Sequence, residues 1–154
     1  MKKLCKKLIS VVLVVFALST FLPCTTYAAF GNSIALGTTG TRNDLIYIKR
    51  PESHSASTSD RTYTISAVGG QGTKIKIYRY DASAGTAKVI KNETTIGASG
   101  LYSVVVDLPN DYNTFLVTAE NGSGNQVVRI DISKIKRSTV DKLKSVTVTV
   151  KNFL

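Results

Sequence analysis

Strict alternation of apolar and polar residues, repeated in successive short segments, is the feature of this sequence that most limits its fold. In residues 73–78 isoleucines alternate with lysines, so that Ile75 and Ile77 share one face. Successive side chains of a β-strand point to opposite faces, so a period of two predicts a strand buried on one side. The same period recurs in 61–68, 101–108, 113–119 and 126–132. The sequence therefore predicts an all-β fold.

Turn signals separate these segments and set the number of strands. Gly-rich or Pro-Asn-Asp stretches lie at 69–72, 109–111 and 121–125, where hairpin turns are expected. Residues 44–50 and 86–96 complete the series, with Val89 and Ile96 as inward candidates in the second. About seven short strands joined by such turns are typical of an antiparallel β-sandwich. A small closed barrel is the alternative that periodicity leaves open.

Residues 1–29 have the pattern of a secretory signal peptide. Four lysines precede an apolar run over 8–22, and Thr26 and Ala28 are the small residues expected before a cleavage site. The apolar run is shorter than the roughly 20 residues that a membrane-spanning helix needs. We expect cleavage after Ala28, with an uncleaved anchor as the alternative, and no transmembrane segment in the chain that remains.

Both cysteines, Cys5 and Cys24, lie inside this segment. The secreted chain is therefore expected to contain no disulfide. Lipid attachment at Cys24 is disfavoured, because bulky residues directly precede it where lipoprotein signals have small ones. A secreted domain without disulfides must be stabilised by its apolar core, which suits a bacterial exported protein.

Two stretches of the remaining chain show no regular period. Residues 30–43 are rich in Gly, Ser, Thr and Asn and are predicted to be a flexible leader before the domain at 44–133. Residues 52–60 are predicted to be a Ser-rich loop.

The C-terminal stretch, residues 134–154, differs from the body in both pattern and charge. Ser138 and Asp141 resemble a helix start, which predicts a short helix over 139–144, and the Val-Thr alternation of 145–151 predicts an eighth strand. The body carries ten basic and nine acidic side chains, whereas the stretch carries six basic and one acidic. Such a basic extension suits an anionic surface. Its candidate contacts are Lys134, Lys136, Arg137, Lys142, Lys144 and Lys151.

The chain has few of the residues that most catalytic and metal-binding sites require. The single histidine, His54, lies in the Ser-rich loop and is interpreted as a solvated loop residue. A tetrahedral zinc site is excluded, because the secreted chain offers no Cys and one His as ligands. Asp107, Asp111 and Glu120 are the carboxylates that could gather for calcium, but they form no Asp-rich loop and are interpreted as turn-formers. We expect no enzyme activity, no cofactor and no metal.

Tyrosines offer a second candidate surface. Tyr47, Tyr78, Tyr80 and Tyr112 could form an exposed aromatic strip for a sugar or a protein, although tyrosine is also common in sandwich cores.

The stretch from Ile46 to Ile132 resembles the bacterial immunoglobulin-like domains of secreted and cell-surface proteins. The resemblance rests on a first strand that closes at Pro51, on the turn and alternating strand of 72–78, and on the order of the segments from 100 to 125. It implies an immunoglobulin-like sandwich of about seven strands. Such domains usually occur in tandem or beside another module, whereas one copy is present here.

Together these observations favour a secreted, non-catalytic binding or structural module at the cell surface or cell wall. An accessory or inhibitor protein that binds a secreted protein partner is the main alternative, and a small hydrolase is a third. The expected partners are an anionic cell-wall polymer, lipid headgroups or a secreted protein, and not nucleic acid.

Overall fold

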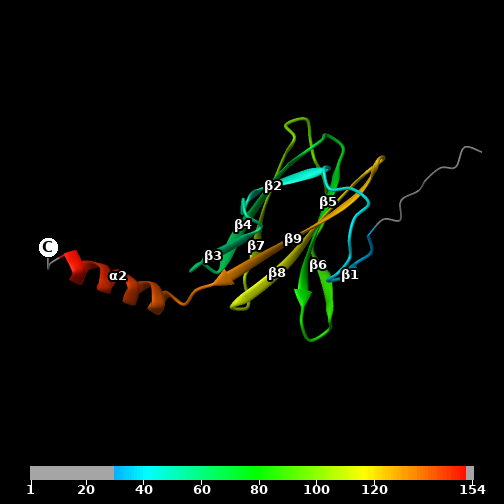
Figure 1. Ribbon diagram of the computed structural model, residues 1–154. Helices are drawn as coiled ribbons and strands as arrows, with labels where there is room; N and C mark the ends of the chain where they lie inside the picture. The colour runs from blue at the N-terminus through cyan, green and yellow to red at the C-terminus, as the bar shows by residue number, and fades with distance from the viewer. Residues whose placement is uncertain (1–29, 152–154) are drawn as a thin grey trace, which may run out of the picture.

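The computed structural model describes residues 30–151, with side chains described as far as Lys144. Nine strands and one helix follow one another along this part of the chain (Figure 1). Their bounds are β1 (Ser33–Ala35), β2 (Ile46–Arg50), β3 (Ser55–Thr58), β4 (Thr62–Gly69), β5 (Lys74–Asp81), β6 (Thr86–Thr95), β7 (Leu101–Asp107), β8 (Tyr112–Asn121), β9 (Gly124–Lys134) and α2 (Arg137–Lys151). The predicted signal peptide lies outside the described residues.

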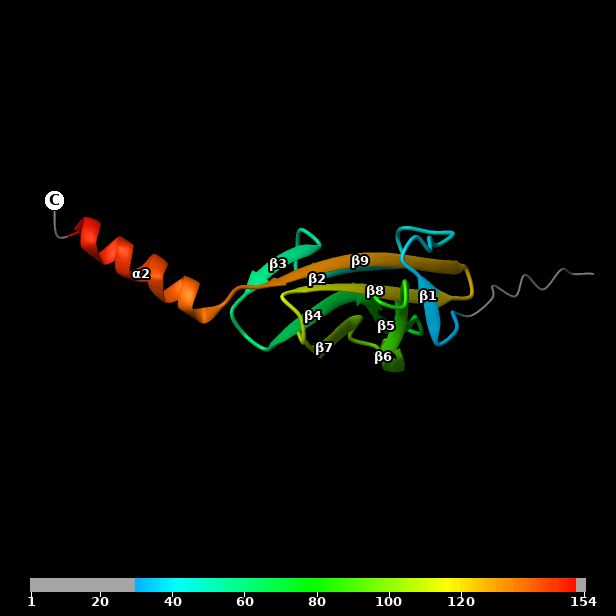
Figure 2. The same cartoon turned by 90° about the horizontal axis from the view of Figure 1, so that it is seen from below.

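The strands form two sheets that pack face to face (Figure 2). The larger sheet has six strands in the order β1-β6-β5-β8-β9-β3, and the smaller has three in the order β2-β4-β7. Neighbouring strands are antiparallel, except that β3 runs parallel to β9. Two separate sheets exclude the closed barrel, and the prediction of an all-β, sandwich-like fold is confirmed.

The core between the sheets consists of the inward residues of the alternating segments. Ile65 on β4, Ile75 and Ile77 on β5, and Val117 on β8 are completely buried there. Each such side chain contributes about 1.5 to 3 kcal/mol when it is removed from water. The period of two therefore identified the core-facing side of these strands correctly.

Residues 30–43, predicted to be a flexible leader, contribute a strand and a second apolar cluster. β1 pairs with the start of β6, and Ile34 packs on the outer face of the larger sheet against Tyr78 and Leu116. The Tyr78 hydroxyl donates to the Gly31 carbonyl at 2.7 Å. Val89 also joins this outer cluster, which corrects its inward assignment. The large apolar residues of this segment, Phe30, Ile34 and Leu36, follow no regular period, so their packing on a sheet could not be predicted from the sequence.

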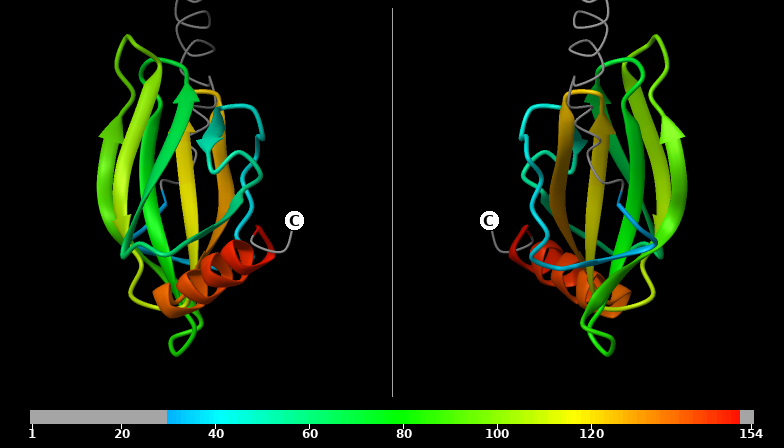
Figure 3. Two further views of the ribbon diagram at one scale, coloured as in Figure 1. Left: turned by 90° about the vertical axis from the view of Figure 1, so that its left-hand side faces the viewer. Right: turned by 90° about the vertical axis from the view of Figure 1, so that its right-hand side faces the viewer.

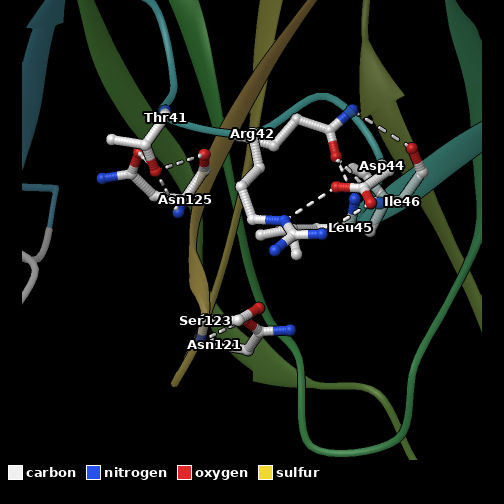
Figure 4. A network of polar contacts seen from close by, with 9 residues as sticks. Thr41, Arg42, Asp44, Leu45, Ile46, Asn121, Ser123 and Asn125 are labelled. Atoms are coloured by element: carbon white, nitrogen blue, oxygen red, sulfur yellow. Dashed lines mark hydrogen bonds and ion pairs between the residues drawn. The ribbon is translucent and has the colours of Figure 1, made fainter.

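The same segment is then attached to the turn between β8 and β9 (Figure 4). The side-chain oxygen of Asn125 accepts a hydrogen bond from the Thr41 N–H at 2.9 Å. The backbone carbonyl of Asn125 accepts one from the Arg42 N–H at 2.9 Å. Gly40 approaches so closely that a Cβ atom there would lie 2.5 Å from the Asn125 carbonyl oxygen. This close backbone approach requires glycine.

The predicted Ser-rich loop contains β3, which adds to the outer edge of β9. His54 adopts φ 59° in the turn before β3, where its N–H donates to the Pro51 carbonyl and its carbonyl accepts from the Asp131 N–H. β3 is therefore held by backbone hydrogen bonds at a sheet edge. Its Ser-Ala-Ser-Thr sequence lacks the apolar alternation that reveals a strand.

The eighth strand predicted at 145–151 is wrong, because α2 continues as one helix to Lys151. A strand needs a partner edge, and β3 already occupies the free side of β9. A helix satisfies its backbone hydrogen bonds within itself, so a chain that leaves the sheets can form one without a partner. Figures 1 and 2 show α2 extending beyond the end of the two sheets. Within residues 30–151, no helix is both long enough and apolar enough to span a membrane.

Candidate anion-binding hollow

A surface hollow of about 410 Å³ lies where the two-sheet body meets α2. Three segments far apart in the sequence contribute to it: the loop before β4, the turn between β7 and β8, and the link from β9 to α2. Its lining residues, here called the basic hollow, are Ser59, Arg61, Asp111, Lys134, Ile135, Lys136 and Arg137.

Backbone hydrogen bonds hold the link to α2 in this position. The Lys134 N–H donates to the Asp111 carbonyl at 2.7 Å, and the Ile135 N–H donates to the Thr58 carbonyl at 2.8 Å. The chain therefore remains fixed between β3 and the β7–β8 turn for one residue beyond β9. This anchoring brings Lys136 and Arg137 beside Arg61, which begins the segment leading into β4.

The hollow carries an excess of positive charge. Arg61, Lys136 and Arg137 are exposed, and Asp111 is the acidic residue among the lining side chains. Arg137 also lies 3.9 Å from a carboxylate oxygen of Asp60, with both side chains more than two-thirds exposed. An ion pair this long and exposed contributes little energy. An anionic ligand with better geometry can therefore compete with Asp60 for the Arg137 guanidinium.

Lys134 has a structural role in the same place. Its ammonium donates to the Leu108 carbonyl at 2.8 Å and to the Pro109 carbonyl at 3.3 Å. These bonds join the end of β9 to the β7–β8 turn. Lys134, one of the residues predicted to contact an anionic surface, therefore uses its charge within the fold.

The structure gathers only some of the predicted contacts into the hollow. Lys136 and Arg137 lie there beside Lys134, whereas Lys142 and Lys144 lie farther along α2. In Figure 3, α2 is the orange-to-red helix that follows β9. The side chain of Lys151, at the end of α2, lies outside the described part. Arg61 was missed, because a single arginine before a strand has no local pattern that indicates a site.

The other candidate groups do not converge. Asp111 precedes β8 and Glu120 lies near its end, about 30 Å apart at the rise of an extended strand. Among the described residues, no cluster of three or more His, Cys, Asp or Glu side chains could hold a metal ion. Tyr78 is fully buried whereas Tyr47 and Tyr112 are mostly exposed, so the four tyrosines do not form one exposed strip.

Comparison with known proteins adds little to this description. No protein-family model matches the chain, and no curated protein matches it. The structure is similar to the crystal structure of an engineered protein, with a TM-score of 0.44 and 12% sequence identity. The similarity covers 60% of this chain and spans only 20% of the engineered one.

Proposed function

We propose that this protein is a secreted, non-catalytic immunoglobulin-like module that binds phosphate-bearing anionic groups at the cell surface or cell wall. The basic hollow carries the proposal, because it brings three exposed cations from two separate segments of the chain to one place. Arg61 and Arg137 provide planar guanidinium groups, which pair with phosphate through two parallel hydrogen bonds. Lys136 adds a compact ammonium charge to the same lining.

The arrangement of the strands supports the immunoglobulin-like part of the proposal. In that fold, the first, second and fifth strands share one sheet, while the third, sixth and seventh share the other. Here β2, β4 and β7 share the smaller sheet, and β5, β8 and β9 lie together in the larger. The chain also passes from the smaller sheet at β2 to the larger at β3, close to Pro51.

The helix α2 supports the surface-binding part. It begins at the hollow and adds Lys142 and Lys144 beyond it. Basic residues near an anionic membrane contribute about 1 kcal/mol each, so the hollow and the helix together can give measurable affinity. Because this attraction is screened, we expect binding to weaken as salt rises from about 0.05 to 0.5 M, where the Debye length falls from roughly 14 to 4 Å.

The test compares the purified protein with two triple variants of equal charge. In the first, Arg61, Lys136 and Arg137 are changed to Gln. In the second, Lys49, Arg79 and Lys91 are changed to Gln, which removes the same charge outside the hollow. Binding is measured by sedimentation with washed cell walls, with phosphatidylglycerol-containing vesicles and with phosphatidylcholine vesicles. Walls with and without their phosphate polymers separate the two sources of phosphate.

We expect the hollow variant to lose at least tenfold in affinity for the phosphate-bearing samples, and the control variant to lose less than threefold. Equal losses would show that net charge, not the hollow, is responsible. Binding that persists in the hollow variant at full strength would overturn the proposal, and so would equal binding to phosphatidylcholine.

A further inference from the structure

Among the residues that the structure describes, β7 has one edge without a strand partner, and this edge is the second feature of the fold that could bind another molecule. Four strands lie at the edges of the two sheets: β1, β3, β2 and β7. Exposed edges can pair with another chain, and proteins commonly protect them by short length, charge, proline or irregular register. The edge that lacks such protection is the one that can accept a strand from another chain.

Three of these edges carry such protection. β1 has three residues and β3 has four. β2 carries Lys49 and Arg50, its register with β4 shifts between Ile48 and Arg50, and Pro51 follows it. The stretch of β6 that does not pair with β1 is protected in the same way, because it carries Lys91 and Glu93 and its register with β5 is irregular.

β7 differs in its length, in its register and in its lack of basic residues and proline. It has seven residues, Leu101–Asp107, and its register with β4 is continuous over the whole length. It contains no lysine, arginine or proline, and two of its outward side chains, Leu101 and Val105, are 65% and 52% exposed. An open, regular and apolar edge of this length is suited to the addition of a strand.

The hydrogen bonds at both ends of β7 identify the backbone groups that face the open side. The Gly69 N–H donates to the Gly100 carbonyl, and the Leu108 N–H donates to the Arg61 carbonyl. Residues of an antiparallel pair alternate between bonding to the partner and facing away from it. The even-numbered residues of β7 therefore bond to β4, and the odd-numbered residues direct their N–H and C=O groups outward.

We propose that this edge pairs with the same edge of a second copy, antiparallel and about a two-fold axis at Val105. This register places Val105 opposite its own equivalent and Ser103 opposite Asp107 of the other copy. It joins two apolar side chains at the axis and gives each Asp107 carboxylate a serine hydroxyl as donor. Every outward backbone group from Ser103 to Asp107 finds a partner.

The outward side chains favour the register centred on Val105 over the adjacent one, which is centred on Val104. A pairing centred on Val104 would use more backbone groups, but it would place Leu101 opposite Asp107 and Ser103 opposite Val105. It would also bring the second copy to the Leu101–Val104 half of the edge, where residues 91–95 of β6 lie beside β7 around a hollow of about 410 Å³. The register centred on Val105 uses the other half.

The first test measures the association state of the purified protein by sedimentation velocity, from about ten to several hundred micromolar. We expect a reversible monomer–dimer equilibrium. Val105→Lys places two like charges at the axis and should make the protein monomeric throughout this range. Leu101→Lys is the matched control, because it makes the same change on the same face outside the register, and it should leave the equilibrium within about twofold.

The second test examines the register directly, in protein whose Cys5 and Cys24 are changed to Ser. Directly opposite residues of a hydrogen-bonded antiparallel pair have Cα atoms about 5.5 Å apart, which a disulfide can bridge. Val105→Cys should therefore form a covalent dimer on mild oxidation, and Leu101→Cys should not. A protein that remains monomeric at every concentration overturns the proposal. So does a dimer that survives Val105→Lys, or cross-linking that is equal at both positions.

Discussion

The side chain of Gln126 forms hydrogen bonds with both backbone groups of Ile46. Its Oε1 accepts from the Ile46 N–H at 2.9 Å, and its Nε2 donates to the Ile46 carbonyl at 3.2 Å. The same Oε1 accepts from the Leu45 N–H at 2.8 Å (Figure 4). Gln126 belongs to β9 of the larger sheet and Ile46 begins β2 of the smaller one, so one buried amide joins the two sheets where the chain enters the core.

Changing Gln126 to Ala is expected to lower the free energy of unfolding by about 3 kcal/mol, because buried backbone groups left without partners cost about 1 to 3 kcal/mol each. Urea unfolding followed by circular dichroism measures the change. Asn121→Ala is the control, since Asn121 also accepts a backbone N–H, from Ser123, but at an exposed turn. A loss for Gln126→Ala no greater than that of the control would contradict this role.

Ile34→Ala tests whether residues 30–43 belong to the folded body. Ile34 packs on Tyr78 and Leu116, so its truncation should cost about 2 to 3 kcal/mol, the lower part of the range for apolar core residues. Tyr78→Phe removes the hydroxyl that bonds to Gly31 and should cost about 1 kcal/mol. If the leader were flexible, as the sequence suggested, both variants would unfold at the same urea concentration as the parent.

Stability should fall in acid partly because of Glu93. Hydrogen bonding and charge from Lys74, at 3.0 Å, hold the pKa of Glu93 below its ordinary value of 4.5, and Lys76 at 3.4 Å acts in the same direction. A lowered folded-state pKa gives stability that is present above pH 4.5 and is lost as pH falls through the folded value. The urea midpoint of the parent should therefore exceed that of Glu93→Gln at pH 7 by a small margin, since the groups are partly exposed.

The difference between the parent and Glu93→Gln should shrink as pH falls from 4.5 through the lowered folded-state pKa of Glu93, because the carboxylate then becomes protonated in the folded state as well. Glu52→Gln makes the same change on an exposed loop residue and serves as the control. A difference that is constant from pH 7 to pH 2.5 would show that the variant acts through packing and not through ionisation.

Removing most of α2 should not affect the stability of the two-sheet body. A chain ending at Arg137 keeps the anchoring bonds of Lys134 and Ile135, so its melting temperature should lie within about 2 °C of the parent's, a difference of at most a few tenths of a kcal/mol. A chain ending at Ser133 loses these bonds and those to the Leu108 and Pro109 carbonyls, and should melt several degrees lower. Equal melting temperatures for the two truncated chains would contradict the structural role of Lys134.

Local pattern was sufficient to identify the strands whose alternate residues face the core. Ile75, Ile77 and Val117 could be assigned inward because a half-buried strand imposes its period directly on the sequence. The turns between these strands were equally visible, because Gly, Asn and Pro are required there for local conformational reasons. The all-β class and the positions of these strands along the chain followed from these two signals.

The remaining features depended on contacts between distant residues. β3 lacks an apolar face. The Val-Thr alternation of 145–151 has the period of a strand, but β3 already occupies the free side of β9, the strand that it follows. The leader covers the outer sheet face through single residues, and the basic hollow forms only when Arg61 meets residues more than seventy positions later. The strands that bury one face can be recognised from local pattern, because burial acts on each segment separately. Which edges are occupied and which charges meet depends on how the segments pack together, so these features emerge only in the folded chain.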